Sequence, residues 1–349
     1  MAGMKKAFVT GISGQDGSYL AELLLEKGYE VWGLLRRHSV PENQTSRLDA
    51  IGVFSNPNLH LVYGDMTDFA SLCHILKDVQ PDEIYNLAAQ SHVRVSFDQP
   101  VFTTNTDALG VLNLLEAVRI VSPNSRMYQA GSSEMFGNEI GENGLQDEGT
   151  LMSPVSPYGC SKLYAYNLCR VYRESYGMYI ANGILFNHES PRRGLNFVTN
   201  KIVDGAVKIA LGKQNKLALG NLDATRDWGH AKDYVRAMWL MLQHKLRVGT
   251  IKEGHDWVCA TGISHSVREF CDIVFTKLGL DYRKHVEVDP KFLRPYELRD
   301  LKGDSTKLRK ALGWEPEYTL DSMIDEMIRE AHVRNRSKED FWTTFRVNR

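Results

Sequence analysis

Residues 7–17 read AFVTGISGQDG, a short apolar run followed by a turn with three glycines. Gly11, Gly14 and Gly17 have the spacing G-x-x-G-x-x-G, and apolar residues recur at helical spacing directly after them. A second apolar run occupies residues 31–35. The stretch therefore predicts a strand–helix–strand unit with parallel strands and a right-handed crossover, which is the start of an α/β fold.

The alternation of strands and helices continues well beyond this unit. Apolar runs predict further strands at residues 59–63, 83–87, 126–130 and 179–186, with helical patterns between them. Alternation of this kind predicts a doubly wound parallel sheet of the Rossmann type. One more strand is expected at 257–261.

The regularity weakens after residue 190, which indicates a second unit. We expect a dinucleotide-binding domain, a smaller mixed α/β domain that binds the substrate, and a polar C-terminal tail. Their expected boundaries are 1–190 plus about 230–262, about 191–229 plus 263–335, and 336–349.

The glycine turn suits a dinucleotide pyrophosphate. The phosphates need a tight turn, a backbone without Cβ atoms at the point of approach, and a helix N-terminus. The second predicted strand ends in Arg36 and Arg37, with no acidic residue before Glu42. An acidic residue at this point bonds the ribose 2′-hydroxyl of NAD, whereas arginine accommodates the 2′-phosphate of NADP. The sequence predicts NADP, and the alternative is a pair of solvated arginines.

Two further segments fit the same cofactor. Asp65 and Met66 follow the third strand, and residues 87–91, LAAQS, follow the fourth. The small side chains of the second segment would let a cofactor lie close to the backbone. The alternative for each segment is an ordinary loop.

A tyrosine and a lysine have the pattern of a catalytic pair. Tyr158 and Lys162 are four residues apart at the start of a predicted helix, so they share one face. An ammonium near a phenol stabilises the phenolate and lowers the pKa of the tyrosine. Tyr158 could then act as a base toward a sugar hydroxyl.

The residues after the fifth strand complete this candidate site. Ser132 and Ser133 are both candidates to hold a substrate hydroxyl beside the tyrosine. Glu134 offers a base that could remove a proton from a carbon next to a newly formed ketone. The alternative is a carboxylate that caps or solvates a loop.

Composition excludes several other classes of protein. The 349 residues contain 42 Lys and Arg and 43 Asp and Glu, which gives no overall attraction to nucleic acid or membrane. No apolar run approaches the about 18 residues of a membrane span, and the N-terminus does not have a signal-peptide pattern. Five cysteines without a C-x-x-C pair favour reduced thiols in the cytoplasm and no metal.

Taken together, the chain resembles the extended short-chain dehydrogenase/reductase superfamily and, within it, the GDP-mannose 4,6-dehydratase family. The resemblance covers about residues 5–330. It depends on the motifs VTGISGQDGSYL, GDMTD, NLAAQSHV, SSEMFG, SPYGCSKLYAY, FNHESPRRG, FVTNKI, LGNLDATRDWGHAKDY and RPYE.

The resemblance implies three groups of site residues. The catalytic group is Ser132, Glu134, Tyr158 and Lys162. The cofactor group is Gly11, Ile12, Ser13, Gly14, Gln15, Asp16, Gly17, Arg36, Asp65, Met66, Leu87, Ala88, Ala89, Gln90, Ser91, Lys162, His188 and Arg193. The group for a guanine-nucleotide sugar is Asn187, Lys201, Arg226, Arg294 and Glu297. Its cations suit a diphosphate.

Three positions depart from the family pattern. The family usually has Thr at Ser132, often Tyr at Phe102, and commonly Arg at Asn200. Ser132 keeps the hydroxyl, whereas Phe102 cannot make the hydrogen bond of a phenol.

The resemblance implies an NADP-dependent lyase that converts GDP-mannose into GDP-4-keto-6-deoxymannose and water. Three alternatives stay open: the same dehydration of another GDP-sugar such as a GDP-manno-heptose, an NADP-dependent epimerase or 4-ketosugar reductase, and a non-catalytic NADP-binding regulator. The resemblance also implies a homo-oligomer, a dimer or tetramer, with the loop HSVPENQTSR at residues 38–47 near an interface.

Overall fold

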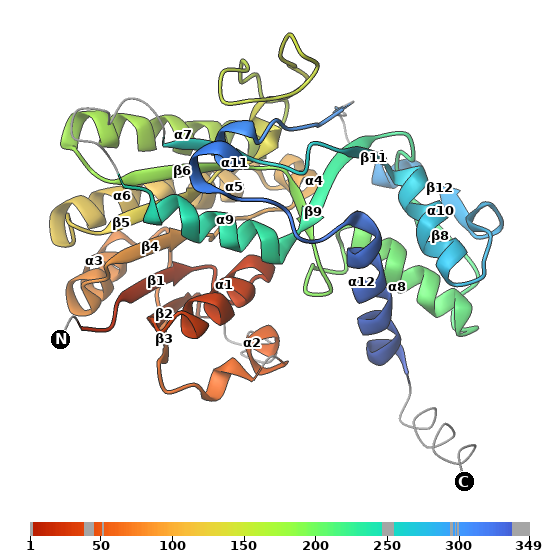
Figure 1. The fold of residues 1–349 in the computed structure, drawn as a ribbon, viewed down its shortest axis with the longest axis horizontal. Coiled ribbons are helices and arrows are strands. Elements are labelled where there is room, and N and C mark those ends of the chain that lie inside the picture. Colours follow the sequence, from red (N-terminus) through yellow and green to blue (C-terminus); the bar gives the residue numbers. More distant parts are fainter. Residues whose placement is uncertain are drawn as a thin grey trace.

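The computed structural model describes residues 3–37, 45–50, 52–245, 255–293, 296, 298 and 300–336. Its largest sheet has seven strands in the order β10-β6-β5-β4-β1-β2-β3, and every neighbouring pair is parallel (Figure 1). The predicted doubly wound sheet is confirmed. Its strands are β1 (Lys6–Thr10), β2 (Glu30–Leu35), β3 (Leu59–Tyr63), β4 (Glu83–Asn86), β5 (Arg126–Ala130), β6 (Ile180–Leu185) and β10 (Asp256–Cys259).

Helices cover both faces of this sheet. One apolar core, which joins α1, α9 and α11 to the sheet, contains Leu20, Val235 and Trp314. A second apolar cluster, built from α3, α6 and α7, contains Leu72, Leu114 and Cys169. The helices are α1 (Gln15–Glu26), α3 (Phe69–Val79), α6 (Gly110–Val121), α7 (Pro157–Tyr176), α9 (Ala231–Gln243) and α11 (Thr306–Leu312).

Strand order reverses between β1 and β4. From β1 the chain runs outward through β2 to β3, and then returns to β4 on the other side of β1 before it continues to β5 and β6. Loops at the carboxyl ends of β1 and β4 therefore diverge to opposite faces of the sheet. Ligands bind at such a switch point in open α/β sheets.

A separate apolar core lies beside the sheet. It joins α8 (Val198–Ala210), α10 (Val267–Lys277) and α12 (Leu320–Asn335) to the parallel strands β8 (Leu217–Leu219) and β12 (Val286–Val288). A three-stranded sheet of β7 (Asn187–Glu189), β9 (Thr225–His230) and β11 (Ser264–Ser266) connects the two regions (Figure 1).

Several short elements carry loop residues into position. They are the helices α2 (Ser46–Ala50), α4 (Val93–Asp98) and α5 (Pro100–Thr104), the π-helical turn Asn105–Leu109, and the 3-10 turns Val53–Ser55, Ser133–Met135, Tyr282–Lys284 and Pro290–Phe292. Over the described residues, no helix has both the length and the apolar character that crossing a membrane requires.

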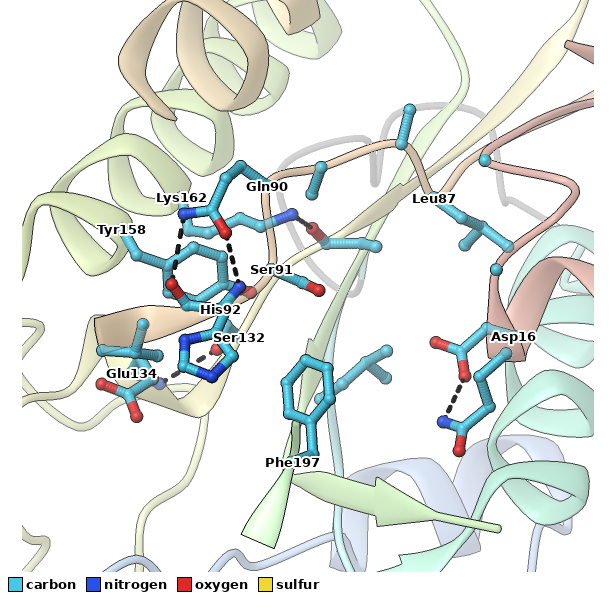
Figure 2. Close-up of a pocket in the computed structure, with 18 of the residues that line it drawn as sticks. Asp16, Leu87, Gln90, Ser91, His92, Ser132, Glu134, Tyr158, Lys162 and Phe197 are labelled. Carbon is cyan, nitrogen blue, oxygen red and sulfur yellow. Dashed lines mark hydrogen bonds between the residues drawn. The ribbon is translucent and has the colours of Figure 1, made fainter. Parts of the chain in front are cut away.

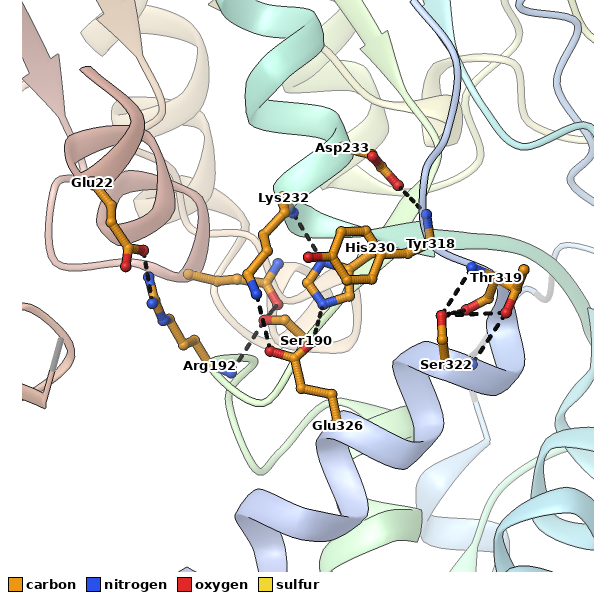
Figure 3. Close-up of polar contacts among 11 residues, drawn as sticks. Glu22, Ser190, Arg192, His230, Lys232, Asp233, Tyr318, Thr319, Ser322 and Glu326 are labelled. Carbon is orange, nitrogen blue, oxygen red and sulfur yellow. Dashed lines mark hydrogen bonds and ion pairs between the residues drawn. The ribbon is translucent and has the colours of Figure 1, made fainter. Parts of the chain in front are cut away.

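Polar contacts join α12 to the start of α9. The Nε2 of His230 lies 2.9 Å from a carboxylate oxygen of Glu326, and Lys232 Nζ lies 3.2 Å from the other oxygen (Figure 3). The backbone N–H of Lys232 donates to His230 Nδ1, so the ring proton is on Nε2 and His230 donates it to Glu326. The hydrogen bond from His230 and the contact with Lys232 together lower the pKa of Glu326 to about 2, against the effect of burial. The contact fixes α12 against the region that contains the large sheet.

Candidate active site

A cavity of about 1230 Å³ opens at the carboxyl ends of the strands, where β1 and β4 diverge. Its wall comes from the large sheet and from the second core, which contributes Lys201, Leu219 and Val267. Sites for a single drug-sized ligand occupy about 300–1,000 Å³. The cavity is therefore large enough for a dinucleotide and a second ligand together.

The glycine turn lies at one end of this cavity, and its backbone leaves room for a ligand to approach closely. Gly11 has a φ of 68°, and a Cβ there would lie 2.9 Å from the backbone of Leu87 and Ala88. A Cβ at Gly17 would lie 2.3 Å from the carbonyl oxygen of Gly11. Because α1 begins after Gly14, no side chain caps its first turn, and its N–H groups can receive a phosphate. The turn fits a dinucleotide pyrophosphate.

The structure brings almost all of the predicted cofactor residues to the cavity wall. They are Gly11, Ser13, Gly14, Gln15, Asp16, Gly17, Arg36, Asp65, Met66, Leu87, Ala88, Ala89, Gln90, Ser91, Lys162, His188 and Arg193. Ile12 differs from them because its side chain is fully buried in the core and packs on Gly33. It can contribute only its backbone to a ligand site.

Arg36 and Arg37 point to different neighbours. The guanidinium of Arg36 lies 5.8 Å from the ring centre of Phe102, and both residues line the cavity. Arg37 instead lies 5.8 Å from the ring centre of the exposed Tyr63, outside the cavity wall. Of the two arginines, Arg36 is thus the one that can contact a cofactor.

Four predicted catalytic residues meet at the other end of the cavity (Figure 2). Ser132 follows β5, and its hydroxyl accepts the backbone N–H of Glu134 at 3.2 Å, which begins the 3-10 turn that carries Glu134. Tyr158 and Lys162 lie on α7, and all four residues are buried. Figure 2 shows Glu134, Ser132 and Tyr158 on the opposite side of the cavity from Asp16.

The local sequence explains where α7 places its two residues. Ser156 caps the helix by accepting the backbone N–H of Gly159 at 3.0 Å, and Pro157 occupies the first helical position. The helix therefore starts at Pro157, directly before Tyr158. Tyr158 and Lys162 are both within its first two turns.

The ammonium of Lys162 lies close to the phenol ring without binding its oxygen in this structure. Lys162 Nζ lies 5.7 Å from the ring centre of Tyr158 and donates to the carbonyl oxygen of Ala130 at 3.1 Å. Burial raises the pKa of Tyr158, the charges of Asp107 and Glu134 raise it further, and a hydrogen bond with Ser132 opposes the shift. The pKa of the Tyr158 phenol is therefore raised in this structure, and not lowered as the Tyr–Lys spacing predicted.

Three of the predicted substrate residues also line the cavity: Asn187, Lys201 and Arg226. Arg226 is buried and donates to the carbonyl oxygen of Leu298 at 3.2 Å. Lys201 Nζ lies 3.4 Å from the ring centre of Phe292, and burial together with nearby Lys291 lowers its pKa. The other two predicted residues, Arg294 and Glu297, lie outside the described residues.

Two of the departures from the family pattern occupy different environments. Phe102 lines the cavity beside Arg36, so the departure removes a hydroxyl from the cofactor end. Asn200 is buried outside the cavity wall, where it donates to the carbonyl oxygen of Arg193 at 2.6 Å. Asn200 therefore holds the backbone of Arg193, which lines the cavity, without lining the cavity itself.

Sequence reasoning missed several residues at the site. His92, Phe197 and Lys291 line the cavity, and Asp107 is buried next to it. The Phe197 ring contacts both His92 and the guanidinium of Arg193, with centre distances of 5.3 and 3.8 Å. Their positions depend on how α8 and the second core pack, which local patterns do not reveal. No cluster of three or more metal-ligating side chains occurs within the described part of the chain.

The fold and the site define an α/β protein of the Rossmann type with a site shaped for a dinucleotide. Among solved structures, a UDP-glucose 4-epimerase of Thermus thermophilus, in complex with NAD, is 25% identical and matches 95% of this chain and all of its own with a TM-score of 0.79. The glycine turn, the cavity and this likeness together support a nicotinamide cofactor.

Sequence comparison then gives the family. A family model described as GDP-mannose 4,6 dehydratase matches residues 8–327. A GDP-mannose 4,6-dehydratase of Yersinia enterocolitica is 48% identical over 93% of both chains, and GDP-mannose 4,6 dehydratase 1 of Arabidopsis thaliana is 50% identical over 93% of this chain and 89% of its own. The chain belongs to the GDP-mannose 4,6-dehydratase family, whose members are sugar-nucleotide hydro-lyases.

Proposed function

We propose that the protein converts GDP-mannose into GDP-4-keto-6-deoxymannose and water, with NADP as its cofactor. The observation that carries this proposal is the presence of Glu134 in the same cavity as Tyr158, Ser132 and Lys162. A simple dehydrogenase or epimerase needs the Ser, Tyr and Lys groups. A carboxylate beside them supplies the additional base that elimination requires.

The assignment of NADP depends on Arg36. Its guanidinium is at the cofactor end of the cavity, where an acidic partner for a ribose 2′-hydroxyl would otherwise be expected. A planar guanidinium binds a phosphate through two parallel hydrogen bonds. The residues that would hold the rest of the cofactor are the glycine turn, residues 87–91, and Asp65 and Met66.

We assign the proton transfers of this reaction to Tyr158 and Glu134. When bound, the nicotinamide supplies a hydride acceptor for sugar carbon 4 and a hydride donor for carbon 6. Tyr158 removes the proton of the C4 hydroxyl, Ser132 holds that hydroxyl, and Lys162 stabilises the phenolate. Glu134 removes the acidified C5 proton and protonates the departing C6 hydroxyl, so that water leaves, and C5 takes up a proton again when carbon 6 receives the hydride.

The second core supplies charges for the diphosphate of the substrate. Lys201 and Arg226 line the cavity from α8 and β9, and we propose that Arg294 and Glu297 complete this region. Cations that are partly withdrawn from water bind phosphates more strongly than exposed ones. On this view the two cores form a cofactor domain and a substrate domain, and the boundaries expected from the sequence need one change, because α11 packs on the core of the large sheet.

Two further properties accompany this function. We propose a homo-oligomer, because the neighbouring helices α6 and α7 both expose apolar side chains that a second copy could cover, namely Ile120, Tyr164, Val171 and Tyr176. We also propose a cytoplasmic location, which is consistent with five cysteines that form no disulfide.

One experiment tests the proposed reaction. The purified protein is incubated with NADP and separately with GDP-mannose, a GDP-manno-heptose, GDP-glucose and GDP-fucose, and the products are weighed by mass spectrometry. We expect a product lighter by one water from GDP-mannose. A heptose product alone would favour the same dehydration on another sugar, and a product of unchanged mass would indicate an epimerase. Absence of turnover with tight NADP binding would indicate a regulator.

A further inference from the structure

Asp107 is a buried carboxylate that the proposed reaction does not use. It lies in the π-helical turn Asn105–Leu109, which packs against α7, and it is 1% exposed. One oxygen, Oδ1, accepts the backbone N–H of Gln90 at 2.7 Å. The other oxygen, Oδ2, is buried without a hydrogen-bond partner among the described residues. A buried carboxylate needs compensation, and one hydrogen bond to a backbone amide supplies only part of it.

The π-helical turn packs against α7, which carries Lys162, and the charge of this lysine acts on Asp107 to lower its pKa. Ser161, its neighbour on α7, has its hydroxyl 3.5 Å from that of Thr104, directly before the π-helical turn. Lys162 is itself buried, and its hydrogen bond to the carbonyl oxygen of Ala130 satisfies one of three N–H donors. A buried ammonium also needs an opposite charge, because desolvation favours its neutral form.

We propose that Asp107 is the counter-ion of the Lys162 ammonium, a positioning residue that keeps this lysine protonated inside the active site. The proposal rests on the proposed function, in which Lys162 must carry a positive charge to stabilise the phenolate of Tyr158. Through its Oδ1, Asp107 also fixes Gln90 in the turn that lines the cofactor end of the cavity.

The electrostatics of the site agree with this geometry. Burial lowers the pKa of Lys162, whereas the charges of Asp107 and then Asp16 oppose that shift. Burial raises the pKa of Asp107 to about 6, against the charge of Lys162 and the hydrogen bond from Gln90. Tyr158 faces the charges of Asp107 and Arg193 as well as Glu134. The charge of Asp107 thus counters the effect that burial has on the pKa of Lys162.

Replacing Asp107 by asparagine separates charge from hydrogen bonding. The amide oxygen of Asp107→Asn can still accept the Gln90 N–H, whereas Asp107→Ala loses both functions. Asp78→Asn, on the surface of α3, removes one negative charge far from the cavity wall and serves as the control.

The direct readout is the titration of Lys162 in protein labelled with [6-¹³C]lysine, with Lys162→Met to assign its resonance. We expect Asp107→Asn to move the Lys162 midpoint down by about one pH unit or more, a tenfold loss of proton affinity. The alkaline limb of the pH profile of kcat should move in the same direction, and Asp78→Asn should move neither. Unchanged Lys162 titration in Asp107→Asn would overturn the proposal, even if that variant lost activity.

If Asp107→Asn is too unstable to titrate, the reciprocal variant Lys162→Met tests the same interaction. Loss of the ammonium in Lys162→Met must raise the pKa of Asp107, because coupling between two sites acts equally in both directions. The carboxyl-carbon resonance of aspartate-labelled protein reports it, and an unchanged Asp107 midpoint would contradict the proposal. Since neither titration requires turnover, failure of the dehydration assay would remove the proposed function and leave this result standing.

Discussion

His188 and Asp16 form an ion pair that joins β7 to the first turn of α1. Nε2 of His188 lies 2.8 Å from a carboxylate oxygen of Asp16, and Nδ1 lies 2.8 Å from the carbonyl oxygen of Phe186. Both ring nitrogens thus face acceptors, so both carry protons and the imidazole is cationic. The pair connects the strand that leads to the second core with the turn that receives phosphate.

This pair predicts a specific pH dependence of stability. Burial opposes both charges, but the pair outweighs it, raising the pKa of His188 and lowering that of Asp16. The stabilisation from His188 is complete below its unfolded pKa of about 6.5 and is lost as pH rises through its higher folded value. The stabilisation from Asp16 is present above its unfolded pKa of about 3.9 and is lost as pH falls through its lower folded value.

We therefore expect His188→Gln to cost about 3 kcal/mol of unfolding free energy near pH 6, because a largely enclosed carboxylate, 21% exposed, loses its partner. The cost should shrink as pH rises. Urea unfolding of both proteins from pH 5 to 9 measures the difference. A cost that stays constant across this range would argue against a charged pair.

Glu134→Gln should stop water loss while leaving the fold and cofactor binding intact. The amide cannot accept the C5 proton, so turnover should fall by on the order of 100-fold or more. Product mass and the melting temperature with NADP are the measurements. Glu139→Gln, an exposed residue shortly after it in the chain, is the control. Near-normal turnover of Glu134→Gln would remove this residue from the mechanism.

Tyr158→Phe should block an earlier step than Glu134→Gln. Without a base at the C4 hydroxyl no hydride leaves carbon 4, whereas Glu134→Gln should still oxidise the sugar. Addition of GDP-mannose to each NADP-loaded variant should therefore give reduced-nicotinamide absorbance with Glu134→Gln alone. Tyr63→Phe, at an exposed tyrosine on β3 outside the cavity wall, should behave as the unmodified protein. The same absorbance from Tyr158→Phe would mean that another group acts as the base.

Arg36 should determine the preference for NADP over NAD, whereas Arg37 should have no effect on it. Arg36 lines the cavity and Arg37 does not, so Arg36→Gln should weaken NADP binding by about 100-fold with little change for NAD. Calorimetric titration of both cofactors measures the ratio. Arg37→Gln should leave the ratio of NADP affinity to NAD affinity unchanged. If Arg37→Gln lost the preference for NADP and Arg36→Gln kept it, Arg37 and not Arg36 would bind the 2′-phosphate.

Local sequence signals were sufficient for the large sheet and for one end of the site. Two short-range patterns carried these predictions: the glycines Gly11, Gly14 and Gly17 between a strand and a helix, and the spacing of Tyr158 and Lys162. Residues this close in sequence stay close in space within one turn or helix, so such patterns can be interpreted before the fold is known. They predicted the parallel sheet, which is confirmed, and they named residues that the structure places in one cavity.

Short-range sequence patterns did not predict the three-stranded sheet of β7, β9 and β11. β9 is almost fully buried although its sequence is TRDWGH, which does not alternate between apolar and polar residues. Asp227 is tolerated there because its carboxylate accepts the backbone N–H groups of Thr261 and Gly262, both distant in sequence. The burial of Asp107 likewise depends on packing against α7, and no local pattern reports such contacts.

The measurement closest to the central claim follows one hydrogen atom. GDP-mannose with deuterium at carbon 4 is incubated with the NADP-loaded protein, and the product is analysed by mass spectrometry and NMR. An intramolecular hydride transfer predicts a product that has lost one water and retains the deuterium at carbon 6. A dehydrated product without the label, or a labelled product of unchanged composition, would contradict the account.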